Sequence, residues 1–320
     1  MRVSAELPLG VVSLFGEAAR RRRGLERVLV ELLEERGYEE VILPVLDYVE
    51  PYERLLTPEA RGELYRFSDR DGEPVALRAD FTPMLARLVA PRVESLDRPC
   101  RFFYRGDVVR YQEARVGRRR EMYQLGVELL GAAGEEGEET VLRLLLELLE
   151  AVADGEARVV LGLAGALDPL LGEVPDPDRL VEAVARRERS PAREGGEALL
   201  EVVKRGRPED PEVLGPAMGD SLRRLRERSR MLEEEFPRFR IEIDLAEFAR
   251  IRRPGVLGDA GGERAYYDGV VFKAYAGDEA LPVATGGRYD TLFARLGAPI
   301  PAVGFSLGLD RLVGANGGSG

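Results

Sequence analysis

The stretch of residues 101–131 constrains the fold more than any other part of the chain. Two runs with alternating apolar residues, 102–111 and 121–129, flank a segment that contains Gly117 and is rich in arginine. Alternation with a period of two is typical of strands, and a glycine-containing segment between two such runs indicates a connecting loop. The sequence therefore predicts an antiparallel hairpin around which the rest of the chain is organised.

Segments on either side of this hairpin predict helices and a second hairpin. Apolar residues recur at helical spacing within residues 13–36 and 141–152, and a short strand is expected at 41–43. Turn residues at 68–72 lie between two strand-like runs and indicate the second hairpin. Thr82 followed by Pro83 is typical of a capped helix start, and this helix is expected to end near residue 90.

The second half of the chain predicts a helical insertion followed by more strands. Helical patterns separated by proline and glycine fill residues 168–236, between two strand-rich parts, so we interpret this region as an insertion. Strands are expected at 239–245, 266–275, 281–284 and 302–307, with a helix at 288–296. The predicted fold class is α+β, with a mostly antiparallel sheet flanked by helices. Residues 1–313 would form this core and residues 314–320 a disordered tail.

The chain contains no histidine and a single cysteine, Cys100. Without an imidazole, this chain alone cannot form a Ser-His-Asp triad, a Cys-His dyad or a histidine-ligated metal site. Residues 304–308 match the G-x-S-x-G pattern of hydrolases, but no histidine is present to deprotonate Ser306. A lone thiol also excludes an internal disulfide. We therefore expect neither hydrolase chemistry nor a metal or cofactor.

The formal net charge of −11 disfavours nucleic acid as a partner. The longest apolar runs cover only a handful of residues, and the first residues lack a basic-then-apolar signal pattern. We expect no membrane partner and a cytoplasmic location.

Polar residues in the run 121–129, the second strand of the central hairpin, are candidates for a ligand site. Gln124 and Glu128 fall on the same face of this strand, and Gly126 between them would leave room for a polar ligand. Asp80 and Thr82 lie at a strand-to-helix junction and could add a carboxylate and a hydroxyl. Alternatively, Asp80 and Thr82 only cap the helix and Glu128 faces solvent, and the pattern does not decide between the two.

Arginine side chains are the candidates for holding an anion. The sequence contains no Walker loop and no strand-linked G-x-G-x-x-G motif, so a glycine-rich phosphate cradle is unsupported. Arg110 lies on the first hairpin strand, and Arg118 and Arg120 border the loop. Guanidinium groups suit carboxylate or phosphate, although a solvated basic loop explains the same pattern.

Five motifs in their expected order resemble class II aminoacyl-tRNA synthetases, and histidyl-tRNA synthetase most of all. Residues 37–44 (GYEEVILP) resemble the first class II motif, which forms the dimer interface in that family. Residues 109–128 resemble the second motif and residues 304–312 (GFSLGLDRL) the third. The tyrosine pair at 266–267 and residues 286–290 (GGRYD) resemble the two signatures of the histidyl enzyme.

The resemblance implies a histidine pocket and a site beside it for a nucleotide. Arg110 would face the ligand carboxylate, or the α-phosphate of ATP in a true synthetase, and Arg311 matches the adenine-side arginine of the third motif. The implied histidine-binding residues are Asp80, Thr82, Gln124, Glu128, Tyr266 and Tyr267.

Departures from the family pattern indicate a protein that binds histidine without activating it. The catalytic arginine of the histidyl enzyme aligns with Gly262, and Arg264 is displaced by two residues. The chain stops just after the third motif, so we also expect no anticodon-binding domain. These features resemble the regulatory subunits of ATP phosphoribosyltransferase, which are non-catalytic, pair with a short catalytic chain and transmit inhibition by histidine in the first step of histidine biosynthesis. The implied partners are this catalytic chain, a second copy of the chain and free histidine. The alternative is a truncated synthetase paralogue that forms histidyl-adenylate for another acceptor.

Overall fold

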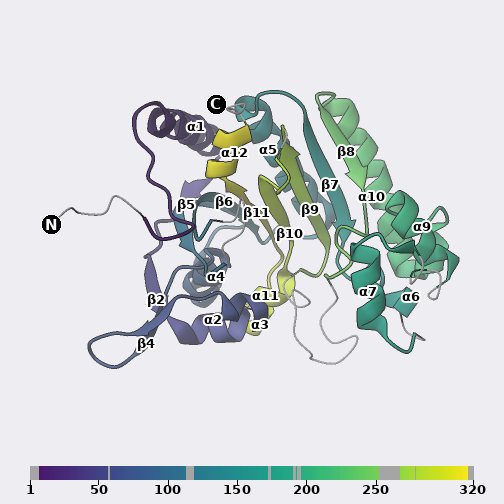
Figure 1. The fold of residues 1–320 in the computed structure, drawn as a ribbon, viewed down its shortest axis with the longest axis horizontal. Helices are drawn as coiled ribbons and strands as arrows, with labels where there is room; N and C mark the ends of the chain where they lie inside the picture. Colours follow the sequence, from purple (N-terminus) through teal and green to yellow (C-terminus); the bar gives the residue numbers. More distant parts are fainter. Residues whose placement is uncertain are drawn as a thin grey trace.

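The computed structural model contains an eight-stranded sheet with helices packed on both faces (Figure 1). The structure describes residues 7–56, 58–112, 119–171, 174–189, 192, 196–251, 267–277 and 279–315. In spatial order, the strands are β1 (Glu39–Glu40), β5 (Cys100–Val109), β6 (Glu121–Leu130), β11 (Ala302–Gly308), β10 (Ala284–Arg288), β9 (Val270–Ala276), β7 (Ala157–Leu163) and β8 (Phe239–Ile243).

The sheet is mostly antiparallel, which confirms the predicted fold class. Five neighbouring pairs, from β5–β6 across to β9–β7, are antiparallel. The edge strands β1 and β8 run parallel to β5 and β7.

The central hairpin forms as predicted and continues without interruption over ten residue pairs. Cys100 of β5 pairs with Leu130 of β6, and Val109 pairs with Glu121. The second predicted hairpin belongs to a separate three-stranded sheet. Its strands, in spatial order, are β2 (Leu46–Tyr48), β4 (Pro74–Leu77) and β3 (Arg66–Ser68).

Two layers of helices bury the apolar faces of these strands. On one face, leucines of α1 (Gly16–Glu35), α5 (Gly134–Val152) and α12 (Leu309–Ala315) pack with the inward residues of β6, β7 and β11. The second layer covers the other side of the hairpin. It consists of α2 (Val49–Leu55), α4 (Thr82–Val89), the 3-10 helix η1 (Ala90–Ser95) and α11 (Asp290–Arg295), and the short helix α3 (Pro58–Gly62) follows α2 in the chain.

The predicted insertion is helical and joins the parallel neighbours β7 and β8. In Figure 1 it lies beside the β8 edge of the sheet. Its elements are α6 (Asp168–Leu171), α7 (Pro177–Ala185), α9 (Glu197–Arg205), the 3-10 helix η2 (Pro211–Leu214) and α10 (Pro216–Glu235).

A buried ion-pair network fixes α10 and β10 against α5. Glu138 of α5 accepts hydrogen bonds from Arg228 of α10 at 2.6 Å and from Arg288 of β10 at 2.8 Å. Arg228 is only 2% exposed, so removal of either carboxylate or guanidinium would leave a charge in the interior.

Several predicted boundaries are wrong, including that of the strand expected at 266–275, which is β9 at Val270–Ala276. The strand expected at 281–284 is β10 at Ala284–Arg288, and the helix expected at 288–296 is α11 at Asp290–Arg295. Gly286 lies within β10, where a Cβ would overlap the backbone of Gly304 and the ring of Phe272. Close packing therefore requires glycine at this position. The short strand expected at 41–43 is β1 at Glu39–Glu40, because pairing with β5 begins two residues earlier.

The last described helix, α12, continues to Ala315, and residues 316–320 of the predicted tail lie outside the described residues. Within the described part of the chain, no helix combines the length and apolar character needed to cross a bilayer.

Candidate functional site

A cavity of about 740 Å³ opens on the face of the sheet formed by β6, β11, β10 and β9. Helix α7 of the insertion and the segment after β8 contribute to its wall. Six of the predicted ligand-binding residues line this one cavity: Asp80, Thr82, Arg110, Gln124, Glu128 and Tyr267.

Glu128 lies at the inner end of the cavity and is 1% exposed. Its carboxylate accepts hydrogen bonds from the hydroxyls of Thr82 at 2.8 Å, Tyr104 at 3.1 Å and Tyr289. Burial raises the pKa of Glu128 to about 7, although these three hydrogen bonds oppose the shift. The alternative in which Glu128 faces solvent is therefore wrong.

Two tyrosines and a glycine complete this carboxylate site and were not among the predicted site residues. Tyr104 is fully enclosed and stacks on Phe81, with ring centroids 4.3 Å apart. Tyr289 follows β10, and a Cβ at Gly304 would overlap the Glu128 carboxylate. The glycines in the sequence were the available signal, since glycine inside a strand often marks the close approach of another group.

Gly126 does not leave room for a ligand, contrary to the sequence-based expectation. Its register partner on β5 is Tyr104, and the Tyr104 ring occupies the space that a Cβ of Gly126 would need. Gln124, two residues earlier on the same face of β6, is half-buried and lines the cavity.

Thr82 is not the N-cap of α4, so this prediction is wrong. Thr82 is the first residue of the helix, and its hydroxyl bonds to Glu128 instead of the helix backbone. The backbone N–H of Thr82 donates to Asp80 Oδ1 at 2.9 Å, so Asp80 satisfies the first free amide of the helix.

Arg110 immediately follows β5 and orients Asp80. Its Nε donates to the carbonyl of Ala79 at 2.7 Å, and a terminal nitrogen donates to Asp80 Oδ2 at 3.2 Å. The side chains of Arg110 and Asp80 are each about a third exposed. Both line the cavity and lie within reach of a bound ligand.

Tyr267 lines the cavity and lies against Gly287 on β10. Tyr266, Gly262 and Arg264 lie outside the described residues. Arg311 is on α12, does not line this cavity, and donates to the carbonyl of Pro282 at 2.5 Å.

Acidic groups dominate the cavity wall. Within the described residues, five carboxylates and three cations line it: Asp80, Glu128, Asp178, Glu182 and Glu247, with Arg110, Arg250 and Lys273. This excess of negative charge favours a ligand that carries at least one positive group. No cluster of potential metal ligands occurs among the described side chains.

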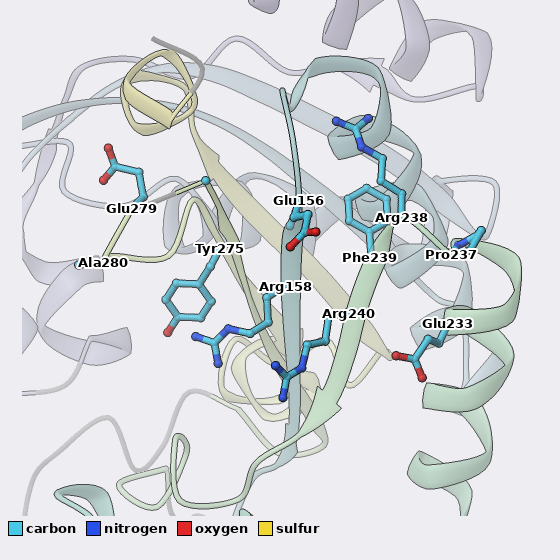
Figure 2. Close-up of a pocket in the computed structure, with 12 residues that line it drawn as sticks. Glu156, Arg158, Glu233, Pro237, Arg238, Phe239, Arg240, Tyr275, Glu279 and Ala280 are labelled. Carbon is cyan, nitrogen blue, oxygen red and sulfur yellow. The ribbon is translucent and has the colours of Figure 1, made fainter. Parts of the chain in front are cut away.

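A second hollow, of about 630 Å³, lies over β7, β8 and β9 near the end of α10 (Figure 2). Its arginines already have partners. Arg238 donates to the carbonyls of Glu150 and Gly155 near the end of α5, while Arg158 and Arg240 both bind Glu242. We assign no ligand to this hollow.

Fold and cavity together define a catalytic core of the class II aminoacyl-tRNA synthetase type. The family model for histidyl-tRNA synthetase matches residues 10–312. The chain is 35% identical to an ATP phosphoribosyltransferase regulatory subunit of Moorella thermoacetica, with 98% of this chain and 82% of that protein covered. A regulatory subunit of Anaeromyxobacter dehalogenans is 37% identical, with 95% of this chain and 89% of that protein covered.

A solved structure from Bacillus halodurans, described as an ATP phosphoribosyltransferase regulatory subunit/histidyl-tRNA synthetase, is also similar. It has a TM-score of 0.79 and 26% identity, and the match covers 99% of this chain and 85% of that one. The chain belongs to the histidyl-tRNA synthetase family, in its branch of ATP phosphoribosyltransferase regulatory subunits.

Proposed function

We propose that this chain is a non-catalytic regulatory subunit that binds free histidine and controls a short catalytic chain of ATP phosphoribosyltransferase. The names of its relatives support the regulatory role. Histidine binding would let the complex respond to the end product of the pathway that this enzyme begins. A coupling free energy of about 1 to 3 kcal/mol between histidine binding on this chain and substrate binding on the catalytic chain is sufficient for such feedback.

The observation that carries this proposal is the buried carboxylate of Glu128 in a cavity with an acidic wall. A histidine ligand brings an ammonium group and an imidazole N–H, and both donate to carboxylate and carboxamide oxygens. Asp80 and Gln124 offer such acceptors at the cavity wall, and Tyr267 offers an aromatic surface for the flat ring.

The altered run at residues 262–265 supports binding without turnover. Formation of an adenylate requires a cation that stabilises charge developing between the carboxylate and ATP, and Gly262 supplies none. Loss of this cation removes stabilisation specific to the transition state, whereas ground-state contacts with histidine persist.

Two measurements on the purified chain test the proposal. Calorimetry should detect saturable binding of histidine, and an affinity-tagged chain should co-purify with a short phosphoribosyltransferase chain from its native cell. Absence of both results would refute the proposed function.

We also propose that two copies of the chain associate through the first-motif region. Ile42 is 87% exposed, and Val45, Leu46 and Tyr48 beside it are also exposed. Several exposed apolar side chains within one short segment are typical of a protein interface. The resemblance of residues 37–44 to the first class II motif supports a second copy as the occupant.

One observation keeps a catalytic alternative open, in which the chain forms histidyl-adenylate. Burial lowers the pKa of Arg311, and the positive charges of Arg110 and Arg119 lower it further, against the opposing charge of Glu279. The charges of Arg110 and Arg119 thus act on Arg311, and guanidinium groups suit a nucleotide phosphate. Histidine-dependent exchange between pyrophosphate and ATP separates the two functions, since a regulatory subunit should show only background exchange.

A further inference from the structure

Lys273 on β9 lines the same cavity as Glu128 but from the opposite side. Lysine occurs only at Lys204 and Lys273 among the 47 lysine and arginine residues of the chain. A flexible ammonium therefore faces the cavity in a protein whose cationic side chains, apart from Lys204, are otherwise guanidinium groups. An ammonium acts as a compact point charge with three donors on a mobile stem.

The register of the sheet places Lys273 across the cavity from Glu128. Lys273 pairs with Thr285 of β10, Thr285 with Ser306 of β11, and Ser306 with Gly126 of β6. These three steps separate β6 from β9 by about 14 Å, given the usual spacing of neighbouring strands. Glutamate and lysine side chains reach inward from the two ends, which leaves a span close to the length of one amino acid.

Small hydroxyl side chains form the floor between the two ends. Thr285 and Ser306 are half-buried and both line the cavity. A ligand whose imidazole binds near Glu128 can therefore extend across this floor and direct its α-carboxylate toward Lys273.

Each of the two arginines that line the cavity already forms two hydrogen bonds to other groups of the protein. Arg110 bonds to the carbonyl of Ala79 and to Asp80, and Arg250 forms two bonds to Glu182, at 2.8 and 2.9 Å. Lys273 donates to Glu247 at 2.8 Å. An ammonium group can keep this bond and still donate to a ligand carboxylate.

Glu247 is itself held in place, so it positions Lys273 at the cavity. The hydroxyl of Tyr275 donates to the same Glu247 oxygen at 2.8 Å. The guanidinium of Arg158 lies over the Tyr275 ring at 4.5 Å, and Figure 2 shows the two side by side on neighbouring strands. Burial opposes ionisation of Glu247, but the bonds from Lys273 and Tyr275 bring its pKa below the ordinary value.

We propose that Lys273 binds the α-carboxylate of the amino acid held in this cavity and thereby selects a free amino acid over the corresponding amino alcohol. The inference rests on the proposed histidine site and assigns to it a contact from β9. The group recognised is the α-carboxylate of a small zwitterion whose cationic side chain binds at the Glu128 end of the cavity.

Calorimetry with histidine and histidinol tests this assignment, because histidinol lacks the carboxylate. We expect Lys273→Met to weaken histidine binding by about tenfold or more, the usual effect of losing a hydrogen bond to a charged group. Histidinol affinity should stay within about twofold of the wild type in this variant, and Lys273→Arg should restore most of the preference for histidine. Lys204→Met, on the exposed surface of α9, is the matched control and should bind both ligands like the wild type.

Chemical labelling of the wild type gives a second measurement that does not depend on a variant folding. With two lysines in the chain, acetylation at each is resolved by mass spectrometry, and saturating histidine should protect Lys273 but not Lys204. If the wild type binds histidine while Lys273→Met keeps the wild-type ratio of the two affinities, or Lys273 is not protected, the assignment is wrong. If the wild type does not bind histidine at all, the proposed function fails and this inference fails with it.

Discussion

Substitution of Glu128 by glutamine is the most informative perturbation of the cavity. The wild-type carboxyl is 1% exposed and accepts from three hydroxyls, so its protonation is coupled to folding. Glutamine has nearly the same shape and does not titrate. The hydroxyls of Thr82, Tyr104 and Tyr289 can rotate to meet its oxygen and its amide group.

The magnitude follows from the difference between the folded and unfolded pKa values. Burial raises the pKa of Glu128 from 4.5 to about 7. The folded state therefore retains a proton that the unfolded state has released between these two pH values, and the free energy of unfolding falls as the pH rises through this window. Each pKa unit corresponds to about 1.4 kcal/mol, so Glu128 alone removes roughly 2 to 3 kcal/mol between pH 5 and pH 8.

Equilibrium urea unfolding at several pH values measures this loss. The wild type should lose stability over this pH range and the variant should not. The free energy of unfolding of Glu128→Gln minus that of the wild type should therefore increase by roughly 2 to 3 kcal/mol between pH 5 and pH 8. Glu34→Gln, on the exposed side of α1, is the matched control and should keep the wild-type pH dependence. If Glu128→Gln loses stability with pH as steeply as the wild type, the buried carboxyl is not the titrating group and the reasoning is refuted.

Three further predictions concern the cavity, the interior and the proposed dimer. Gly304→Ala should abolish measurable histidine binding by calorimetry, because the added methyl overlaps the Glu128 carboxylate. The control Gly24→Ala, inside α1, should leave histidine binding intact and stabilise the fold by about 0.5 to 1 kcal/mol. Arg228→Met should lower the free energy of unfolding by about 1.5 to 3 kcal/mol in urea, since Glu138 loses one of its two buried cationic partners, and a loss below about 1 kcal/mol would contradict this account. Ile42→Glu should convert a dimer to a monomer in analytical ultracentrifugation without changing the far-ultraviolet circular dichroism, and an unchanged sedimentation coefficient would place the interface elsewhere.

Sequence periodicity determined the parts of the fold that depend on local pattern. The alternation within 101–131 predicted the hairpin of β5 and β6, and helical spacing predicted α1, α5 and the helices of the insertion. Residue types alone also excluded imidazole chemistry. The motifs indicated the family and, through it, six residues that the structure brings to one cavity.

Tertiary structure alone decided the environment of those residues. Strand order places β11 beside β6 and so brings Gly304 against Glu128, although 176 positions separate them in the sequence. The register of β5 on β6 puts the Tyr104 ring over Gly126, and the register of β9 turns Lys273 toward the cavity. Local pattern cannot supply these contacts, because a shift of one residue in register reverses the face of every side chain while leaving the alternation unchanged.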